Sequence, residues 1–401
     1  TVGSGATFDA PNSTVTFDGT SGTHAITSGG QSFYRLKVNG AGGTWQLADA
    51  LTTTDSLQVA AGTFNTSNGT VYDVTCGELV LSGGALTLNS SAVSVSGSYT
   101  VTGGTLTAGT STLVLNGTSG THSITCGGQN LNNVTVNGSG GTWQLADDFT
   151  CSSTLTVQAG TLNLNDGTAH NLTCGVLDIQ SGLFDASVGT PTISVGGNLT
   201  IANTGDIAEF GTGSVVTLTA TANLFNPNWG NIFNDLTQSG SIVTTLTSDI
   251  MVNGTLTGGA GSTIQADATD RTLRLYSPPT VSTVTWGGGT GTLLIDAWMG
   301  GQTFPADDYG DCNIRFTSTS TQTITLGGNV TTTGDITTGT DWSDNRMITI
   351  DLNGNNLTCQ NLTLGISGQP LQAGTMLLTN STAALTVNGN LTIHPDANAT
   401  Y

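Results

Sequence analysis

Residues 19–49 read GTSGTHAITSGGQSFYRLKVNGAGGTWQLAD, and residues 117–147 read GTSGTHSITCGGQNLNNVTVNGSGGTWQLAD. Equivalent positions in the two stretches, such as Trp45 and Trp143, are 98 residues apart. The same offset continues beyond them, from Gly62 to Gly160. A constant offset indicates tandem repetition, and the period of a repeat decides the architecture before any single residue does.

A shorter motif recurs inside each copy. It consists of an apolar residue, a polar residue that is usually Thr, and a small or apolar residue. Its steps are 21 to 25 residues long, and four of them make 98, so we expect a coil of 21–25 residues as the elementary unit. The third positions are Ser28, Thr53, Cys76, Val101, Cys126, Cys151, Cys174 and Val195.

The coils are predicted to consist of short strands. Stretches such as TLTVQAGTLNL and NLTCGVLDI alternate apolar and polar residues, as a strand with one buried face requires. Gly, Asn, Asp and Ser interrupt them every few residues, which is typical of turns. No stretch keeps the 3.6-residue period of a helix. The predicted fold is therefore all-β, a parallel β-helix (β-solenoid), expected to be right-handed and to contain about 16 coils.

The pattern predicts three segments. Residues 1–212 form a regular solenoid that contains the 98-residue repeat, 213–320 hold diverged coils with longer loops, and 321–401 return to regular coils. Four segments begin with an apolar residue and carry a second apolar anchor near 20 residues later. The pairs are Leu36 and Leu57, Val134 and Leu155, Leu236 and Leu256, and Ile314 and Ile336.

Charge and hydropathy limit the partners of this chain. It has 26 acidic and six basic residues, with a net charge of −20, so we expect no nucleic-acid partner. No run of about 18 or more apolar residues occurs, and we expect no membrane insertion. The chain begins at Thr1 in repeat-like sequence without a signal peptide, which favours a processed mature protein or a piece of a longer one. We expect it to be secreted, at the cell surface.

Several Asn side chains are candidates for glycosylation. Sixteen Asn-x-Ser/Thr sequons occur, many of them expected by chance in a chain so rich in Asn and Thr. In a host that glycosylates its surface proteins, exposed ones are acceptors. The candidates are Asn12, Asn68, Asn116, Asn133, Asn253, Asn361 and Asn390.

The cysteines share the third position of the coil motif. Equivalent Cα atoms on adjacent coils lie roughly 4.8 Å apart, within disulfide range, so Cys126, Cys151 and Cys174 are disulfide candidates. The third position also holds apolar residues, and free Cys packs well in a core, so buried thiols are the competing interpretation. The sequence contains no Cys-x-x-Cys pair, so a zinc site is not expected.

Few residues suggest a site. Asp307, Asp308 and Asp311 form the densest acidic cluster and a candidate Ca²⁺ site, against the simpler interpretation of solvated turns. Trp45 and Trp143 each lie two positions before a Leu, so they face the same side of a strand as that Leu and are predicted to be in the core. The other tryptophans lie in less regular sequence, where exposed rings would stack on sugars, against the competing interpretation of ordinary packing. They are Trp229, Trp286, Trp298 and Trp342.

Motifs such as GGTWQLAD, VNGTLT, GGNLTI and NGTSGT resemble those of the repetitive β-helix proteins of prokaryotic cell surfaces. The resemblance covers nearly the whole chain. It implies a passive adhesive, envelope or filament role, and it carries over no catalytic residue.

Three functions follow from this reading. The first is a non-enzymatic structural protein that assembles with other copies of itself into a filament, sheath or surface layer. The second is an adhesin or receptor-binding fibre, including a phage tail fibre, whose glycan-binding patch lies within 220–320. The third is a polysaccharide lyase or hydrolase, which the scarcity of Lys and Arg disfavours. We expect no enzyme activity and no cofactor, with Ca²⁺ the one candidate ion.

Overall fold

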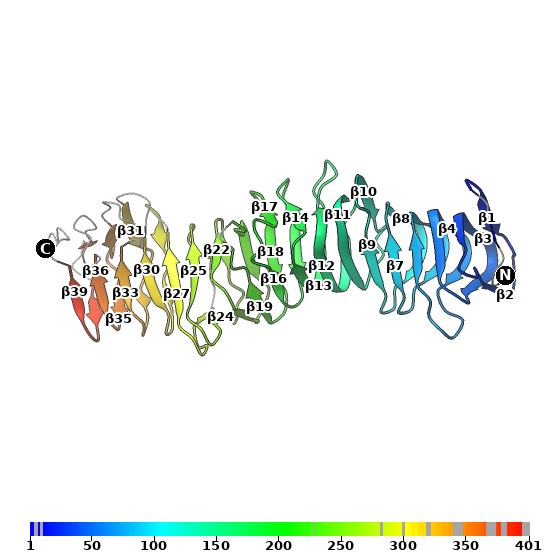
Figure 1. Ribbon diagram of the computed structural model, residues 1–401. Coiled ribbons are helices and arrows are strands. Elements are labelled where there is room, and N and C mark those ends of the chain that lie inside the picture. The colour runs from blue at the N-terminus through cyan, green and yellow to red at the C-terminus, as the bar shows by residue number, and fades with distance from the viewer. Residues whose placement is uncertain are drawn as a thin grey trace. The chain divides into compact units, whose positions relative to one another are not determined.

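A computed structural model of the 401-residue chain was analysed. It describes residues 1–3, 7–8, 11–228, 230–280, 284–298, 301–317, 322–339, 348–365, 374–377 and 383–394. The fold is all-β, 57% strand, with stacked parallel strands that form a β-solenoid of about 15 turns (Figure 1). No described residue is in a helix. The predicted fold class is confirmed, with about 15 turns in place of the 16 expected.

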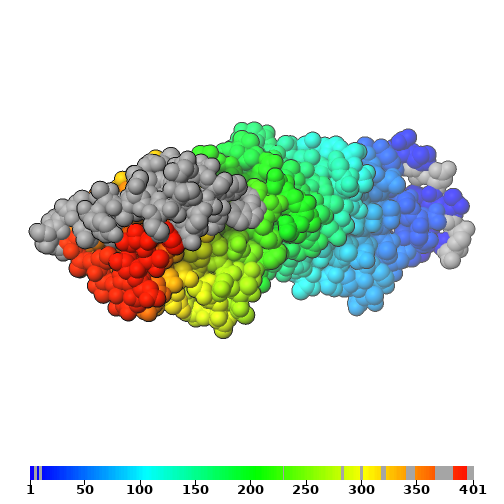
Figure 2. All heavy atoms as spheres, turned by 60° about the vertical axis from the view of Figure 1, so that its left-hand side comes forward, coloured from blue at the N-terminus to red at the C-terminus, as the bar shows by residue number. Residues whose placement is uncertain are grey.

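The chain forms two compact units, the first of residues 1–196 and 204–214 and the second of residues 197–203 and 215–401. Within each unit, successive turns lie in chain order (Figure 2). The divisions predicted at residues 212 and 320 both stay predictions, and the first lies close to the last residue of the first unit, Ser214.

The first unit consists of parallel strands that pair from turn to turn. Its strands are β1 (Thr14–Phe17), β2 (Thr23–Ile26), β3 (Ser32–Leu47), β4 (Leu51–Asn65), β5 (Val74–Cys76), β6 (Glu78–Thr87), β7 (Ala92–Val95), β8 (Tyr99–Thr107), β9 (Thr112–Leu115), β10 (Thr121–Thr125), β11 (Asn133–Leu145), β12 (Phe149–Asn163), β13 (Leu172–Ile179), β14 (Leu183–Ala186), β15 (Thr192–Val195) and β17 (Ala208–Phe210).

The second unit begins with strands in the same style and continues as three separate sheets. The strands are β16 (Leu199–Ile201), β18 (Val215–Leu218), β19 (Ala222–Phe225), β20 (Asp235–Gln238), β21 (Val243–Leu246), β22 (Ile250–Val252), β23 (Leu256–Thr257), β24 (Thr263–Ala266), β25 (Arg271–Leu275), β26 (Thr285–Trp286), β27 (Leu293–Ala297), β28 (Thr303–Phe304), β29 (Asp307–Asp308), β30 (Asn313–Phe316), β31 (Gln322–Leu326), β32 (Val330–Thr331), β33 (Ile336–Thr338), β34 (Ile348–Asp351), β35 (Leu357–Cys359), β36 (Leu362–Leu364), β37 (Gly374–Leu377), β38 (Leu385–Val387) and β39 (Leu391–Ile393). The sheets are β22-β25-β27-β30-β33-β36-β39, β28-β31-β34-β37 and β29-β32-β35-β38.

Within each unit, the core is a stack of inward-facing apolar side chains. In β12, for example, Leu155, Val157 and Leu162 are buried while their polar neighbours are not. Trp45 and Trp143 are buried, as predicted. All four predicted anchor pairs are in-register partners on adjacent turns, which confirms them. They are Leu36 with Leu57, Val134 with Leu155, Leu236 with Leu256, and Ile314 with Ile336.

Glycine permits the close approach of backbones at the sharp bends of the long strands. Gly62 and Gly160 are equivalent in the two repeat copies and have φ values of 77° and 79°. A Cβ on Gly160 would lie 2.2 Å from the carbonyl oxygen of Gly138, closer than real Cβ contacts. Only glycine therefore suits this bend, on both conformational and steric grounds.

The motif spacing predicts four whole turns in the 98-residue repeat. The structure contradicts this prediction. Val134 is the repeat equivalent of Leu36, yet it pairs with Leu113 and Leu155 in another column of the core. The coils are also less uniform than the predicted 21–25 residues, because register partners on adjacent turns are separated by 19 to 29 positions. The successive in-register partners of Leu36 are Leu57, Leu79, Tyr99 and Ile124, and the chain reaches Ile124 before Val134.

Candidate functional site: a buried arginine–aspartate network

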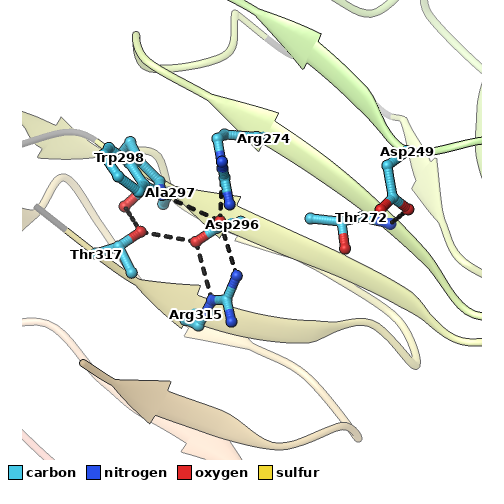
Figure 3. A network of polar contacts seen from close by, with 8 residues as sticks. All are labelled: Asp249, Thr272, Arg274, Asp296, Ala297, Trp298, Arg315 and Thr317. Carbon is cyan, nitrogen blue, oxygen red and sulfur yellow. Dashed lines mark hydrogen bonds and ion pairs between the residues drawn. The ribbon is translucent and has the colours of Figure 1, made fainter. Parts of the chain in front are cut away.

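Three charged side chains stack on the outer face of β25, β27 and β30. Leu273, Ile295 and Ile314 of these strands are buried in the core, so the intervening positions face outward. Those positions hold Arg274, Asp296 and Arg315, which are direct register partners on three consecutive turns. Their charges alternate along the stack (Figure 3).

The carboxylate of Asp296 accepts hydrogen bonds from four side chains. Its Oδ2 accepts from Arg274 Nε at 2.8 Å, Arg315 Nη2 at 2.9 Å and Trp298 Nε1 at 3.0 Å. Its Oδ1 accepts from Thr317 Oγ1 at 2.7 Å and Arg315 Nε at 3.1 Å. The Arg315 contact is bidentate, the strongest arrangement for this pair of groups. Both oxygens are thus fully occupied by donors.

Aromatic rings cover the network from outside. The guanidinium of Arg274 lies 4.8 Å from the centroid of the Trp298 ring, a cation–π distance. The Tyr276 ring lies 5.8 Å from that of Trp298. Although Asp296 occupies an outward position, it is 0% exposed, while Trp298 and Tyr276 are half-buried. This part of the outer face is therefore closed by its own side chains.

The electrostatics favour an ionised Asp296. Burial alone would raise the pKa of Asp296, but the hydrogen bonds and charges of Arg315, Thr317 and Arg274 together hold it below its usual value. A carboxylate with a lowered pKa and both oxygens occupied by donors is a poor general base, since it has no lone pair directed at a substrate. What the arrangement does is connect three turns through one anion.

This network is absent from the sites predicted from sequence, although a signal for it exists. The chain has only six basic residues, and two of them flank one Asp in the short alternating stretches LRL, IDA and IRF. The spacings are 22 residues from Arg274 to Asp296 and 19 from Asp296 to Arg315. Because these two coils differ in length, a search at constant period misses the alignment.

A ladder of Asx side chains connects turns in the same unit. Asn313 Oδ1 accepts from the backbone N–H of Asp335 at 2.9 Å, and Asp335 Oδ1 accepts from that of Asn361 at 3.2 Å. Asn361 Oδ1 in turn accepts from the N–H of Asn390 at 2.8 Å. Each side chain thereby satisfies a backbone donor of the next turn, which would otherwise lack a partner at the bend.

The predicted Ca²⁺ residues serve as local acceptors. Asp307 Oδ2 accepts from Trp286 Nε1 at 2.9 Å, Asp308 Oδ1 from the Gly310 N–H at 3.1 Å, and Asp311 Oδ1 from the Gly288 N–H at 3.0 Å. No group of three or more metal-ligating side chains occurs within the described ranges. Calcium binding at Asp307, Asp308 and Asp311 stays a prediction.

All six cysteines are buried as free thiols. Cys151 and Cys174 are register partners on β12 and β13, as the motif predicts. Cys126 is not in register with Cys151, because Leu131 occupies that position. Burial raises the pKa of Cys126 and Cys174 to about 12 and that of Cys151 to about 11. A disulfide between Cys151 and Cys174 stays a prediction.

The glycosylation candidates fall into two groups. Asn133 and Asn361 are half-buried, and their amides are hydrogen-bonded within the chain, to Asn132 Oδ1 and Asp335 Oδ1. The remaining candidates are exposed and therefore better acceptors. They are Asn12, Asn68, Asn116, Asn253 and Asn390.

The tryptophans outside the repeat differ in their surroundings. Trp286 is buried, which agrees with ordinary packing rather than with a sugar-stacking ring at this position. Of the two that the structure describes, Trp298 reaches the outer face, over Arg274. Trp229 and Trp342 lie outside the described residues.

No protein-family model matches the sequence, and comparisons with curated proteins and with solved structures likewise found no match. Within the described part of the chain, no helix is long and apolar enough to cross a membrane.

Proposed function

We propose that this chain is a non-enzymatic structural β-solenoid of the cell exterior, which assembles with further copies of itself into a filament, sheath or surface layer. The observation that carries the proposal is the use of polar side chains to join turn to turn. The Asx ladder and the Asp296 network both connect successive turns, and their hydrogen-bonding groups are directed at the chain itself.

A stack in which each turn is hydrogen-bonded to the next gains stability with length. That is the property a load-bearing surface protein needs. The assembly step is supported by the sequence motifs that resemble cell-surface β-helix proteins, and the low number of basic residues favours neither nucleic acid nor anionic membranes as partners.

Electron microscopy of the purified chain, together with sedimentation velocity over a hundredfold concentration range, tests the proposal. We expect ordered filaments, tubes or sheets whose fraction rises with concentration. Single particles of unchanged sedimentation coefficient throughout the range would refute self-assembly.

The second candidate function is an adhesin that recognises glycans. The half-buried Trp298 and Tyr276 rings on the outer face of the second unit favour it, because sugars stack on such rings. Tyr276→Ala is the suitable probe, since the Tyr276 ring is not bonded to Asp296. We expect it to abolish binding on a glycan array while the melting temperature changes little, and unaltered binding would eliminate this candidate.

A further inference from the structure

An open groove of about 490 Å³ crosses the outer face of four strands in the first unit. The strands are β1, β3, β4 and β6, which pair in that order on consecutive turns. A groove of this size is typical of small-ligand sites. Its polar lining consists mainly of Arg35, Lys37, Asp55, Ser56, Gln58 and Glu78.

The groove contains every basic residue of its unit. Arg35 and Lys37 are the only Lys or Arg in residues 1–196 and 204–214. Arg35 Nε is paired with Asp55 Oδ2 at 2.6 Å, and its guanidinium lies 5.1 Å from the centroid of the Tyr34 ring. The side chain of Lys37 makes no hydrogen bond or ion pair with any residue that the structure describes. Among the described residues, Lys37 and Glu78 are therefore the two charged side chains of the groove without a partner of opposite charge.

The second repeat copy shows that these charges are not needed for folding. β11 pairs with β12 in the same register as β3 with β4, including the irregularity after the third apolar residue. The flanking GGTWQLAD is identical in both copies. The charged groove residues are among the positions that change: Arg35, Lys37, Asp55 and Glu78 correspond to Asn133, Thr135, Ser153 and Val176. A charged set that the scaffold does without is best explained by a ligand.

We infer that this groove binds an acidic saccharide of the hexuronate class. The ligand carboxylate would pair with Lys37, whose compact ammonium is the one cation of the groove without an anionic partner. Ring hydroxyls would donate to the carboxylates of Asp55 and Glu78 and accept from the amide of Gln58. A neutral sugar would satisfy these hydroxyl contacts but leave Lys37 unpaired.

The inference goes beyond the assembly proposed above and does not depend on it, because the groove is complete within one copy. Its failure and the failure of assembly are measured by separate experiments, binding of a sugar in the first case and sedimentation in the second.

Isothermal titration with a galacturonic acid tetrasaccharide tests the site, with the neutral galactose tetrasaccharide as the matched ligand. We expect one binding site for the acidic sugar, at least about tenfold tighter than for the neutral one, with an affinity that falls as salt rises. Lys37→Thr, which copies the second repeat, should weaken acidic binding at least tenfold and bring the two sugars to similar affinity.

The repeat also supplies the folding control and a gain-of-function test. The variant R35N/K37T/D55S/E78V carries only residues that the second copy already accommodates, so it should keep the wild-type circular dichroism spectrum and lose binding. The reciprocal variant N133R/T135K/S153D/V176E should raise the stoichiometry from one site to two. Equal binding of both sugars, no binding by the wild type, or full binding by Lys37→Thr would each overturn the inference. Loss of self-association in R35N/K37T/D55S/E78V without any saccharide binding would instead identify the groove as a contact between copies.

Discussion

Cys151 and Cys174 lie directly opposite each other on adjacent turns, and both thiols are free and buried. Their pKa values are raised, to about 11 and about 12, because burial disfavours the thiolate. Since the thiolate is the reactive form, proximity alone does not make this pair reactive.

We therefore expect the folded chain to resist alkylation. At pH 8, iodoacetamide should modify none of the six thiols within an hour while the chain is folded, and all of them in denaturant. Mass spectrometry of intact protein under both conditions is the measurement. Rapid modification of the folded chain would contradict the buried placement.

Material from an oxidising compartment also tests the predicted disulfide, through a cross-linked Cys151–Cys174 peptide that disappears on reduction.

Stability should fall in alkali. The pKa of Cys76 and of Cys174 is raised to about 12 in the folded chain, against roughly 8.5 for an exposed thiol. Above the unfolded value, the unfolded chain has lost these protons and the folded chain keeps them, so the free energy of unfolding decreases with pH until the folded pKa is reached. Each such thiol contributes about 1.4 kcal/mol per pH unit in that window.

Chemical denaturation between pH 8 and 11 measures this slope. Cys76→Val and Cys174→Val are suitable comparisons, because Val95 and Val195 occupy the in-register positions on the next turn. We expect the alkaline slope to become shallower in each variant, and a slope unchanged by both substitutions would show that the thiols are not its source.

The Asp296 network should be far more important for stability than the surface ion pair. Asp296→Asn leaves the buried Arg274 and the half-buried Arg315 without their anion, which costs about 3–5 kcal/mol. Asp55→Asn removes the partner of Arg35 at an exposed site and should change stability only slightly. Urea denaturation of the two variants makes the comparison. Similar decreases in the free energy of unfolding of both variants would show that burial does not determine the contribution of an ion pair here.

The lowered pKa of Asp296 also predicts a response to acid. Because the folded value lies below the unfolded one, the stabilisation is fully present above the unfolded pKa and is lost as pH falls through the folded pKa. Asp296→Asn should remove this part of the acid dependence. If the free energy of unfolding decreases at low pH equally in the wild type and in Asp296→Asn, the network is not the source of the acid dependence.

Gly160 provides a test of the close backbone approach at the bends. Gly160→Ala introduces a Cβ that would lie 2.2 Å from the Gly138 carbonyl oxygen, in addition to the positive φ. Gly167 has φ 119° and open space around it, so Gly167→Ala carries the backbone penalty alone, about 1–2 kcal/mol. Thermal melts should therefore rank Gly160→Ala well below Gly167→Ala. Equal melting temperatures would mean that the bend relaxes around the new methyl group.

Sequence reasoning predicted the solenoid and the inward cysteines because each depends on the residue alternation of a single strand. It also found the anchor pairs, which are one turn apart, but it failed where the motif had to be aligned over several turns. Val101 was assigned to the column of Cys76, but it pairs with Leu81, while Cys76 pairs with Val95. The same three-residue motif occurs on more than one face of the solenoid, so its spacing does not define one turn.

The site was unpredictable for a related reason. Arg274, Asp296 and Arg315 belong to coils of unequal length. Their register pairing depends on where each coil bends and not on a constant sequence interval. The groove around Lys37 likewise becomes visible only when four strands are placed side by side. Composition indicates that basic residues are rare here, and the register shows where they meet.

Leu36 and Val134 belong to different columns because one repeat copy holds a non-integral number of turns. Duplication of this segment therefore does more than lengthen the stack, since each new copy begins at a different azimuth from the last. The charged groove residues and their uncharged equivalents in the second copy consequently lie on different faces of the solenoid. A lineage that adds copies thereby distributes one ancestral surface around the circumference, where each version is free to acquire its own chemistry.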